Sequence, residues 1–225
     1  SINNQTRYTV RTKKMCGIFG SNNYEQLKTL YSINKERGSF AYGYLYRDGT
    51  GGPLIQRGSG DTMPSSIVDT EDFNYYLGHT QGPTSSEREF SPATSHPFTA
   101  SRWYVAHNGV LSNYKDLYPD NPCVVDSSVI PYLLDKNDES HPVATISAVC
   151  SLLQGTFACW IYDEMENVIY LVRCGSTLFH KEGCFSSKQP DNTWSTMSEG
   201  VVYKLVDNDF SAQDKFKSNS PYFIL

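Results

Sequence analysis

The stretch Met15-Cys16-Gly17-Ile18-Phe19-Gly20 is the most informative part of the chain, because a cysteine directly after a methionine opens a short apolar strand that ends on glycine. If the chain were cut after Met15, Cys16 would carry a free α-amine beside its own thiol. An α-amine has a pKa of about 7.7–8, so part of it is neutral at pH 7 and can accept the thiol proton. Nucleophile and base would then belong to one residue. A buried structural cysteine in a first strand is the alternative.

Length and composition predict one globular domain. The chain has 225 residues, of which 39% are hydrophobic and 13% aromatic, and this size supports a single well-buried core. No apolar run is long enough to span a bilayer, and no secretory signal is visible. The six cysteines lack the spacing of a metal site, so we expect reduced core thiols in a cytoplasmic protein rather than a disulfide framework.

The charge of the chain is unevenly distributed. Its net charge is −5, yet the first fourteen residues hold four basic side chains and no acid. Such a basic arm is typical of a propeptide or an upstream extension, and it is also able to bind an anionic partner. The remaining chain is acidic, which argues against nucleic acid as a direct ligand.

The pattern of apolar residues predicts short helices between strands. Tyr24–Asn34 has helical periodicity with Asn22 or Asn23 as the N-cap and Gly38 as the end of the run, and Ser127–Leu134 and Pro142–Gln154 also favour helices. Residues 81 to 100 are typical of a long functional loop. Few β-α-β alternations occur, so we expect an α+β fold built on antiparallel sheets. The expected strands are Phe40–Tyr46, Asn74–Thr80, Trp103–His107, Thr156–Tyr162 and Val168–Arg173.

Five segments in order carry a family resemblance: Cys16-Gly17-Ile18-Phe19-Gly20, Arg37-Gly38-Ser39-Phe40-Ala41-Tyr42-Gly43, Gly78-His79-Thr80, His107-Asn108-Gly109 and Val125-Asp126-Ser127. Their order and gaps resemble the glutaminase domain of class II glutamine amidotransferases, the N-terminal-nucleophile family that includes glucosamine-6-phosphate synthase. The resemblance implies a four-layer αββα sandwich of two antiparallel sheets over residues 16–225. Residues 1–15 would be a basic extension or propeptide.

The resemblance also implies roles for particular residues. Cys16 would attack the side-chain amide of glutamine, and the Asn108 amide with the Gly109 N–H would stabilise the oxyanion, since acyl transfer needs fixed donors. A type I′ hairpin turn is the alternative for this Asn-Gly pair. Asp126 would hold the substrate α-ammonium or cap a helix. The other substrate-binding candidates are Arg37, Gln81, Thr84 and His107. His79, His96 and His107 suit packed, hydrogen-bonded positions better than a metal or triad, and we expect no metal and no cofactor.

The sequence departs from the family pattern at two places. The family has an arginine after Gly-His-Thr that pairs with the substrate carboxylate, whereas this chain has Gln81. Arg88 and Arg102 are candidates to replace the lost charge. The second departure is the extension through Met15: while it remains attached, the Cys16 nitrogen is an amide without basicity.

These residues predict glutamine hydrolysis through a Cys16 thioester, which would release glutamate and pass ammonia to a separate partner synthase. Two alternatives remain open. An N-terminal-nucleophile hydrolase or acyltransferase acting on another amide is favoured by Gln81, and a catalytically inactive binding or structural module is favoured by the attached extension.

Overall fold

The computed structural model describes residues 15–47, 51–67, 75–82, 89–138 and 141–217. Its first sheet has seven strands in the order β11-β9-β10-β1-β4-β2-β3, and every neighbouring pair is antiparallel. The strand that follows Cys16 lies near its centre. The strands of this sheet are β1 (Gly17–Ser21), β2 (Ala41–Tyr46), β3 (Leu54–Ser59), β4 (Tyr76–Gln81), β9 (Phe179–Lys181), β10 (Cys184–Ser186) and β11 (Ser195–Thr196).

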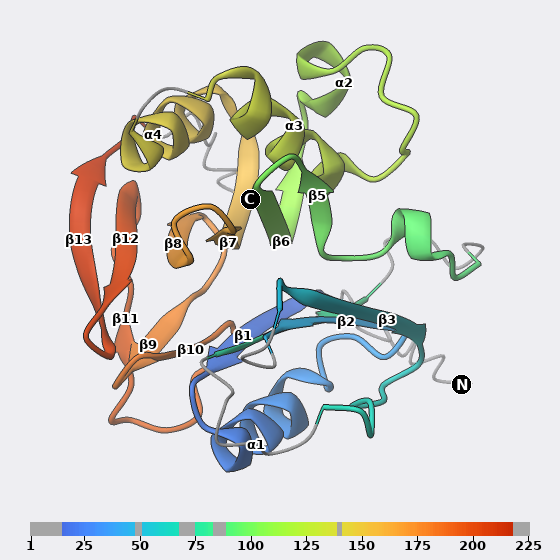
Figure 1. Cartoon of the computed structure of the whole chain (residues 1–225), viewed down its shortest axis with the longest axis vertical. Helices are drawn as coiled ribbons and strands as arrows, with labels where there is room; N and C mark the ends of the chain where they lie inside the picture. Colours follow the sequence, from blue (N-terminus) through green and yellow to red (C-terminus); the bar gives the residue numbers. More distant parts are fainter. Residues whose placement is uncertain (1–14, 48–50, 68–74, 83–88, 139–140, 218–225) are drawn as a thin grey trace, which may run out of the picture.

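The second sheet has six strands in the order β13-β12-β8-β7-β6-β5, again antiparallel. Its longest strands, β6 and β7, pair from Trp103 opposite Asp163 to Leu111 opposite Gly155. The two sheets face each other in Figure 1. The strands are β5 (Phe98–Ala100), β6 (Trp103–Leu111), β7 (Gly155–Asp163), β8 (Val168–Cys174), β12 (Val201–Val206) and β13 (Asp209–Lys215).

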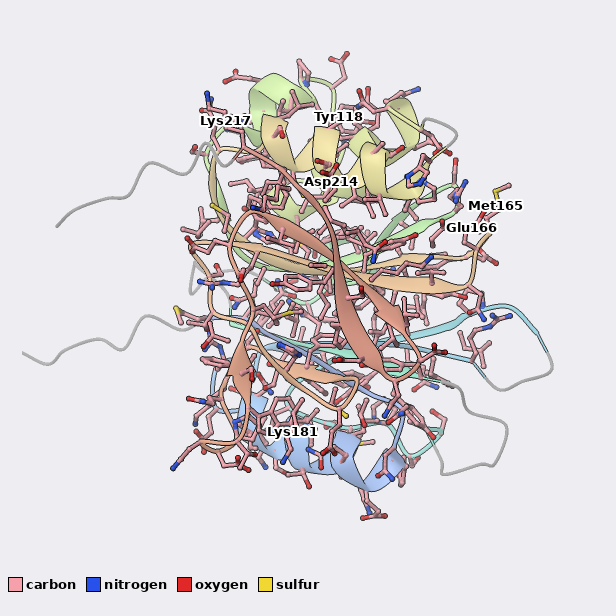
Figure 2. All side chains as sticks on the ribbon, turned by 90° about the vertical axis from the view of Figure 1, so that its left-hand side faces the viewer. Tyr118, Met165, Glu166, Lys181, Asp214 and Lys217 are labelled. Carbon is pink, nitrogen blue, oxygen red and sulfur yellow. The ribbon has the colours of Figure 1, made fainter. Side chains whose placement is uncertain are left out.

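Helices cover the outer face of each sheet (Figures 1 and 2). One buried cluster joins α1 to the first sheet through Phe19, Leu27 and Leu30, and another joins α3 and α4 to the second sheet. Apolar burial of this kind contributes roughly 25 cal/mol per Å². The helical segments are α1 (Tyr24–Asn34), α2 (Tyr114–Leu117), α3 (Val129–Lys136), α4 (Pro142–Leu152) and the 3₁₀ turns η1 (Pro92–Thr94) and η2 (Asp126–Ser128).

A third cluster fills the space between the sheets and completes the four layers. It includes Ile18 and Leu77 of the first sheet and Trp160 of the second, all at most 1% exposed. Trp160 Nε1 also donates a hydrogen bond to the Gly78 carbonyl at 3.1 Å, so the indole satisfies its polar group across the layer. The structure thus confirms the predicted αββα sandwich of two antiparallel sheets.

Most of the expected elements are present, with different ends. The helix Tyr24–Asn34 has the predicted bounds, and Asn23 caps it by accepting a hydrogen bond from Gln26 N at 2.9 Å. Gly38 does not end this helix, because Lys35 is already its C-cap. The expected long loop from residue 81 to 100 contains η1 and β5. The expected strand Trp103–His107 continues to Leu111.

Neither the helices nor the cysteines alter this plan. Within the described ranges, no helix is long and apolar enough to cross a membrane. The six cysteines, all in described positions, remain thiols as expected.

Candidate active site

Cys16 lies directly before β1 and is half-buried. Its thiol donates to the Gly82 carbonyl at 3.8 Å. Because β1 pairs with β4 through Gly17 opposite Thr80, continuation of that register places Cys16 opposite Gln81. Both side chains then share a face with Ile18 and His79, since alternate residues of a strand point the same way. That face looks toward the second sheet.

Arg37 holds the backbone on both sides of the bond that precedes Cys16. Its Nε donates to the Cys16 carbonyl at 2.8 Å, and its own carbonyl accepts the Met15 N–H at 3.1 Å. Burial lowers the pKa of the Arg37 guanidinium, while charge on Cys16 opposes that shift. Arg37 is therefore half-buried against the backbone around Cys16.

Asn108 and Gly109 lie inside β6, opposite Ala158 and Phe157 of β7. The hairpin-turn alternative for this pair is therefore wrong. Gly109 has φ +144°, and a Cβ there would lie 2.0 Å from the Thr156 carbonyl oxygen. Only glycine fits this close backbone approach. Asn108, 4% exposed, has the strand parity of the inter-sheet residue Ala106, so it faces the sheet that carries Cys16.

One hydroxyl connects Asn108 to the strand of Cys16. Ser187 Oγ accepts the Ile18 N–H at 2.9 Å and lies 3.4 Å from Asn108 Nδ2. Sequence reasoning missed Ser187, because a serine in the polar stretch after a short strand carries no distinguishing signal. Only the pairing of distant segments brings it to the site.

Asp126 lies beside Leu111, the last residue of β6. One carboxylate oxygen accepts the Leu111 N–H at 2.7 Å and the other accepts the Ser127 N–H at 2.9 Å. The prediction that Asp126 caps a helix is wrong, because it is the first residue of η2, whose N-cap is Val125. The contact instead ties this turn to the end of β6.

The three histidines are packed inside the fold. His107 turns to the helix-covered face of β6, where its Nδ1 lies 2.7 Å from Ser127 Oγ and its Nε2 donates to the Thr156 carbonyl at 3.2 Å. The structure therefore does not bring His107 to the face shared by Cys16 and Asn108. His79 stacks on His96 with ring centroids 3.7 Å apart. Burial lowers the pKa of His79 to about 3. In the described ranges, no three His, Cys, Asp or Glu side chains gather in a way that suits a metal ion.

Gln81 is 3% exposed, and within the described residues its Oε1 has no hydrogen-bond partner. Gly38 packs against it so closely that a Cβ would lie 2.3 Å from the Gln81 carbonyl carbon. Arg102 does not supply a charge here, because it pairs with Asp163 at the opposite end of β7. Thr84 and Arg88 lie outside the described residues.

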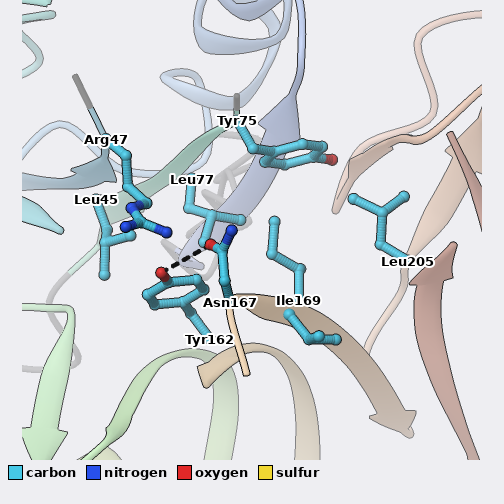
Figure 3. Close-up of a pocket in the computed structure, with 9 residues that line it drawn as sticks. Leu45, Arg47, Tyr75, Leu77, Tyr162, Asn167, Ile169 and Leu205 are labelled. Carbon is cyan, nitrogen blue, oxygen red and sulfur yellow. Dashed lines mark hydrogen bonds between the residues drawn. The ribbon is translucent and has the colours of Figure 1, made fainter. Parts of the chain in front are cut away.

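A cavity of about 140 Å³ opens between the sheets (Figure 3). Leu77 and Tyr162 line it, and Tyr162 donates a hydrogen bond to Asn167 at 3.0 Å. Tyr162 lies four residues along β7 from Ala158, the partner of Asn108, which is roughly 13 Å at the rise of a strand. The cavity is therefore separate from the candidate site.

No family model matches the chain. Among curated proteins, it is 27% identical over 178 residues to a glutamine–fructose-6-phosphate aminotransferase of Oceanobacillus iheyensis. It is 28% identical over 180 residues to the protein of that name from Staphylococcus epidermidis. Both matches cover 73% of this chain and 30% of the relative. The chain thus spans about a third of the length of these relatives.

Solved structures share the fold at low sequence identity. The glutamine phosphoribosylpyrophosphate amidotransferase of B. subtilis superposes with a TM-score of 0.69 at 18% identity, covering 90% of this chain and 49% of that one. A glutamine aminotransferase class-II domain protein from Silicibacter pomeroyi gives a TM-score of 0.54 at 12% identity, covering 90% and 100%. In sequence and in fold, the chain resembles class II glutamine amidotransferase domains, which confirms the resemblance that its motifs indicate.

Proposed function

We propose that this chain hydrolyses the side-chain amide of glutamine with Cys16 as the nucleophile. The observation that carries the proposal is the meeting of two segments from opposite sheets: Cys16 before β1 and Asn108-Gly109 within β6, joined through Ser187. The curated relatives are glutamine-using aminotransferases by name. The resemblance supplies the role of each residue, and the geometry is compatible with it.

The reaction needs a liberated α-amine on Cys16. This amine takes the thiol proton, and the sulfur attacks the amide carbon to form a tetrahedral oxyanion. Asn108 and the Gly109 N–H stabilise that oxyanion, and each such donor is worth roughly 10²–10³ in rate. Collapse breaks the C–N bond, the amine's proton leaves with ammonia, and water then hydrolyses the thioester to glutamate.

The substrate would be held by residues around this centre. Asp126 binds the α-ammonium, with Arg37, Gln81 and Thr84 as further candidates, whereas the ring of His107 lies on the other face of β6. Ammonia passes to a partner synthase unit, which would use it as the aminotransferases that this chain resembles do by name. Residues 1–15 act as an extension whose removal activates Cys16.

Two forms of the protein test this function: one beginning at Cys16 and one retaining residues 1–15. We expect glutamate and ammonia release from glutamine only by the first form, and loss of that activity in Cys16→Ala. Cys123→Ala is the matched control, since Cys123 is also a half-buried thiol. Equal activity of the two forms would exclude the α-amine as base.

A second candidate is hydrolysis of another amide, and Gln81 favours it. The Gln81 side chain is neutral and so lacks the charge that an arginine offers to a carboxylate, and its Oε1, which has no partner among the described residues, is able to accept a hydrogen bond from a substrate N–H. A panel of carboxamides that includes glutamine with a blocked α-carboxylate separates the two. Faster turnover of the blocked substrate would favour this candidate.

An inactive module is the third candidate. It is favoured by the hydrogen bond from Met15 N to the Arg37 carbonyl, which ties the residue before Cys16 into the fold. N-terminal sequencing of the natural protein tests it. A mature protein that retains Met15 would leave Cys16 without its amine and would support this candidate.

A further inference from the structure

Ser187 lies where the two sheets come together beside Cys16. It follows β10 directly and is 0% exposed. Its hydroxyl accepts the N–H of Ile18, two residues after Cys16, and the amide of Asn108 at 3.4 Å. A single oxygen atom therefore contacts both the strand of the nucleophile and the strand of the proposed oxyanion donor.

The backbone of Ser187 is fixed without its hydroxyl. Its N–H donates to the Ile18 carbonyl at 2.8 Å, and its carbonyl accepts from Thr177 Oγ1 at 2.7 Å. In a regular ladder, a backbone carbonyl would receive the Ile18 N–H. Here the hydroxyl does so instead. Loss of the hydroxyl therefore leaves two bonds that keep this segment in place.

The hydroxyl constrains the Asn108 amide. A carboxamide has two N–H donors and an oxygen in one plane, and its terminal torsion is soft, with two broad minima. When one N–H binds Ser187, the plane and the direction of the second N–H are set. Without that contact the amide can rotate and present its oxygen, which repels an oxyanion.

We propose that Ser187 is a positioning residue that acts through Asn108, holding its amide so that one N–H points toward the oxygen of the carbonyl group that Cys16 attacks. The proposal rests on the proposed function. Fixed donors stabilise a transition state without reorganisation during the reaction. Ser187 therefore contributes to the rate of the chemical step rather than to substrate affinity.

The test uses the form that begins at Cys16 and compares Ser187→Ala with Asn108→Ala and the double variant. We expect Ser187→Ala to lower kcat at least about tenfold, with KM nearly unchanged. This loss should be smaller than the roughly 10²–10³-fold loss of kcat that removal of a donor causes. In the Asn108→Ala background, removal of the hydroxyl has little further effect, because residues that act through each other are not additive.

The matched control is Ser186→Ala. Ser186 is also 0% exposed, and its hydroxyl accepts from Asn34 Nδ2 at 2.8 Å on the other face of the sheet. We expect this variant to lose stability and retain kcat. A full kcat in Ser187→Ala, or the same fold-loss with and without Asn108, would overturn the proposal.

A second measurement decides the inference even if glutamine is not the substrate. The side-chain amide of Asn108 gives a ¹⁵N–¹H resonance pair, identified by its absence from Asn108→Ala. We expect this pair to shift in Ser187→Ala and to stay in place in Ser186→Ala. An unchanged pair in Ser187→Ala rules out the positioning contact, whereas an inactive wild-type protein counts only against the proposed function.

Discussion

A single methyl group on Gly109 tests the local geometry of β6. In Gly109→Ala, the added Cβ would lie 2.0 Å from the Thr156 carbonyl oxygen and 2.9 Å from His107 Nε2. Real Cβ atoms do not approach this closely, so either β6 moves away from β7 or Gly109 leaves its φ of +144°. Both changes displace the backbone N–H proposed as an oxyanion donor.

The cost has two parts. A non-glycine residue held at such a φ costs about 1–3 kcal/mol, and overpacking against the fixed Thr156 backbone adds a similar 1–3 kcal/mol. We therefore expect a loss of roughly 3 kcal/mol, which lowers the Tm by about 6–12 °C in a chain of this size. Displacement of a donor lowers kcat by about 10²–10³.

Two other glycines serve as controls. Gly60 has φ +90° and nothing within 4 Å of a built Cβ, and Gly51 has open space without a positive φ. Gly60→Ala therefore reports the backbone strain alone, and Gly51→Ala reports neither effect. Urea unfolding gives the stability of each variant, and glutamate release from glutamine gives kcat for the form that begins at Cys16.

Gly109→Ala should be less stable than Gly60→Ala by the steric part of the cost. Equal stability of the two variants, together with an unchanged kcat in Gly109→Ala, would refute both the close approach to Thr156 and the role of this N–H.

Three further predictions concern residues around the site. Gln81→Arg places an unpaired charge in a buried position, so we expect a lower Tm without ligand, a KM for glutamine reduced by up to about 10–100-fold and recovery of the Tm in saturating glutamine; an unchanged KM would mean that the carboxylate binds elsewhere. Burial lowers the pKa of His79 to about 3, so between pH 6.5 and 3 the unfolded chain takes up a proton that the folded chain does not. The free energy of unfolding should therefore decrease as the pH is lowered from 6.5 to 3, by up to about 1.4 kcal/mol per pH unit. His79→Phe should lack this component in urea titrations, and an identical pH slope in both proteins would contradict the prediction. Trp160→Phe removes the donor to the Gly78 carbonyl across the sheets and should cost about 1–3 kcal/mol in the same unfolding assay, so a neutral result would show that this bond contributes nothing.

Local signals in the sequence predicted the elements with strong periodicity. Helix α1 has its expected bounds because its apolar spacing and the Asn23 cap act within the same few residues. The continuation of β6 through Asn108-Gly109 could not be read locally, since the same dipeptide forms turns, and here the pairing with β7 decides its conformation.

The candidate site was predictable where a motif marks it. Cys16 and Asn108 were identified from short patterns, and the structure puts both on facing sheets. Ser187 was missed because its proposed role depends on contacts with Asn108, which lies 79 positions away in the chain, and with Ile18, which lies 169 positions away. His107 was expected near the substrate, yet strand parity turns its ring toward the helices, a detail that depends on the register of β6.

The two hydrogen bonds of Arg37 bear on the proposed removal of residues 1–15. Its carbonyl accepts a hydrogen bond from the N–H of Met15, while its side chain donates one to the carbonyl of Cys16. Severing the bond between those two residues removes the first contact and leaves the second intact. After such a cut, the Arg37 side chain would still hold the carbonyl of the new terminal residue, while the Arg37 carbonyl would no longer accept the Met15 N–H.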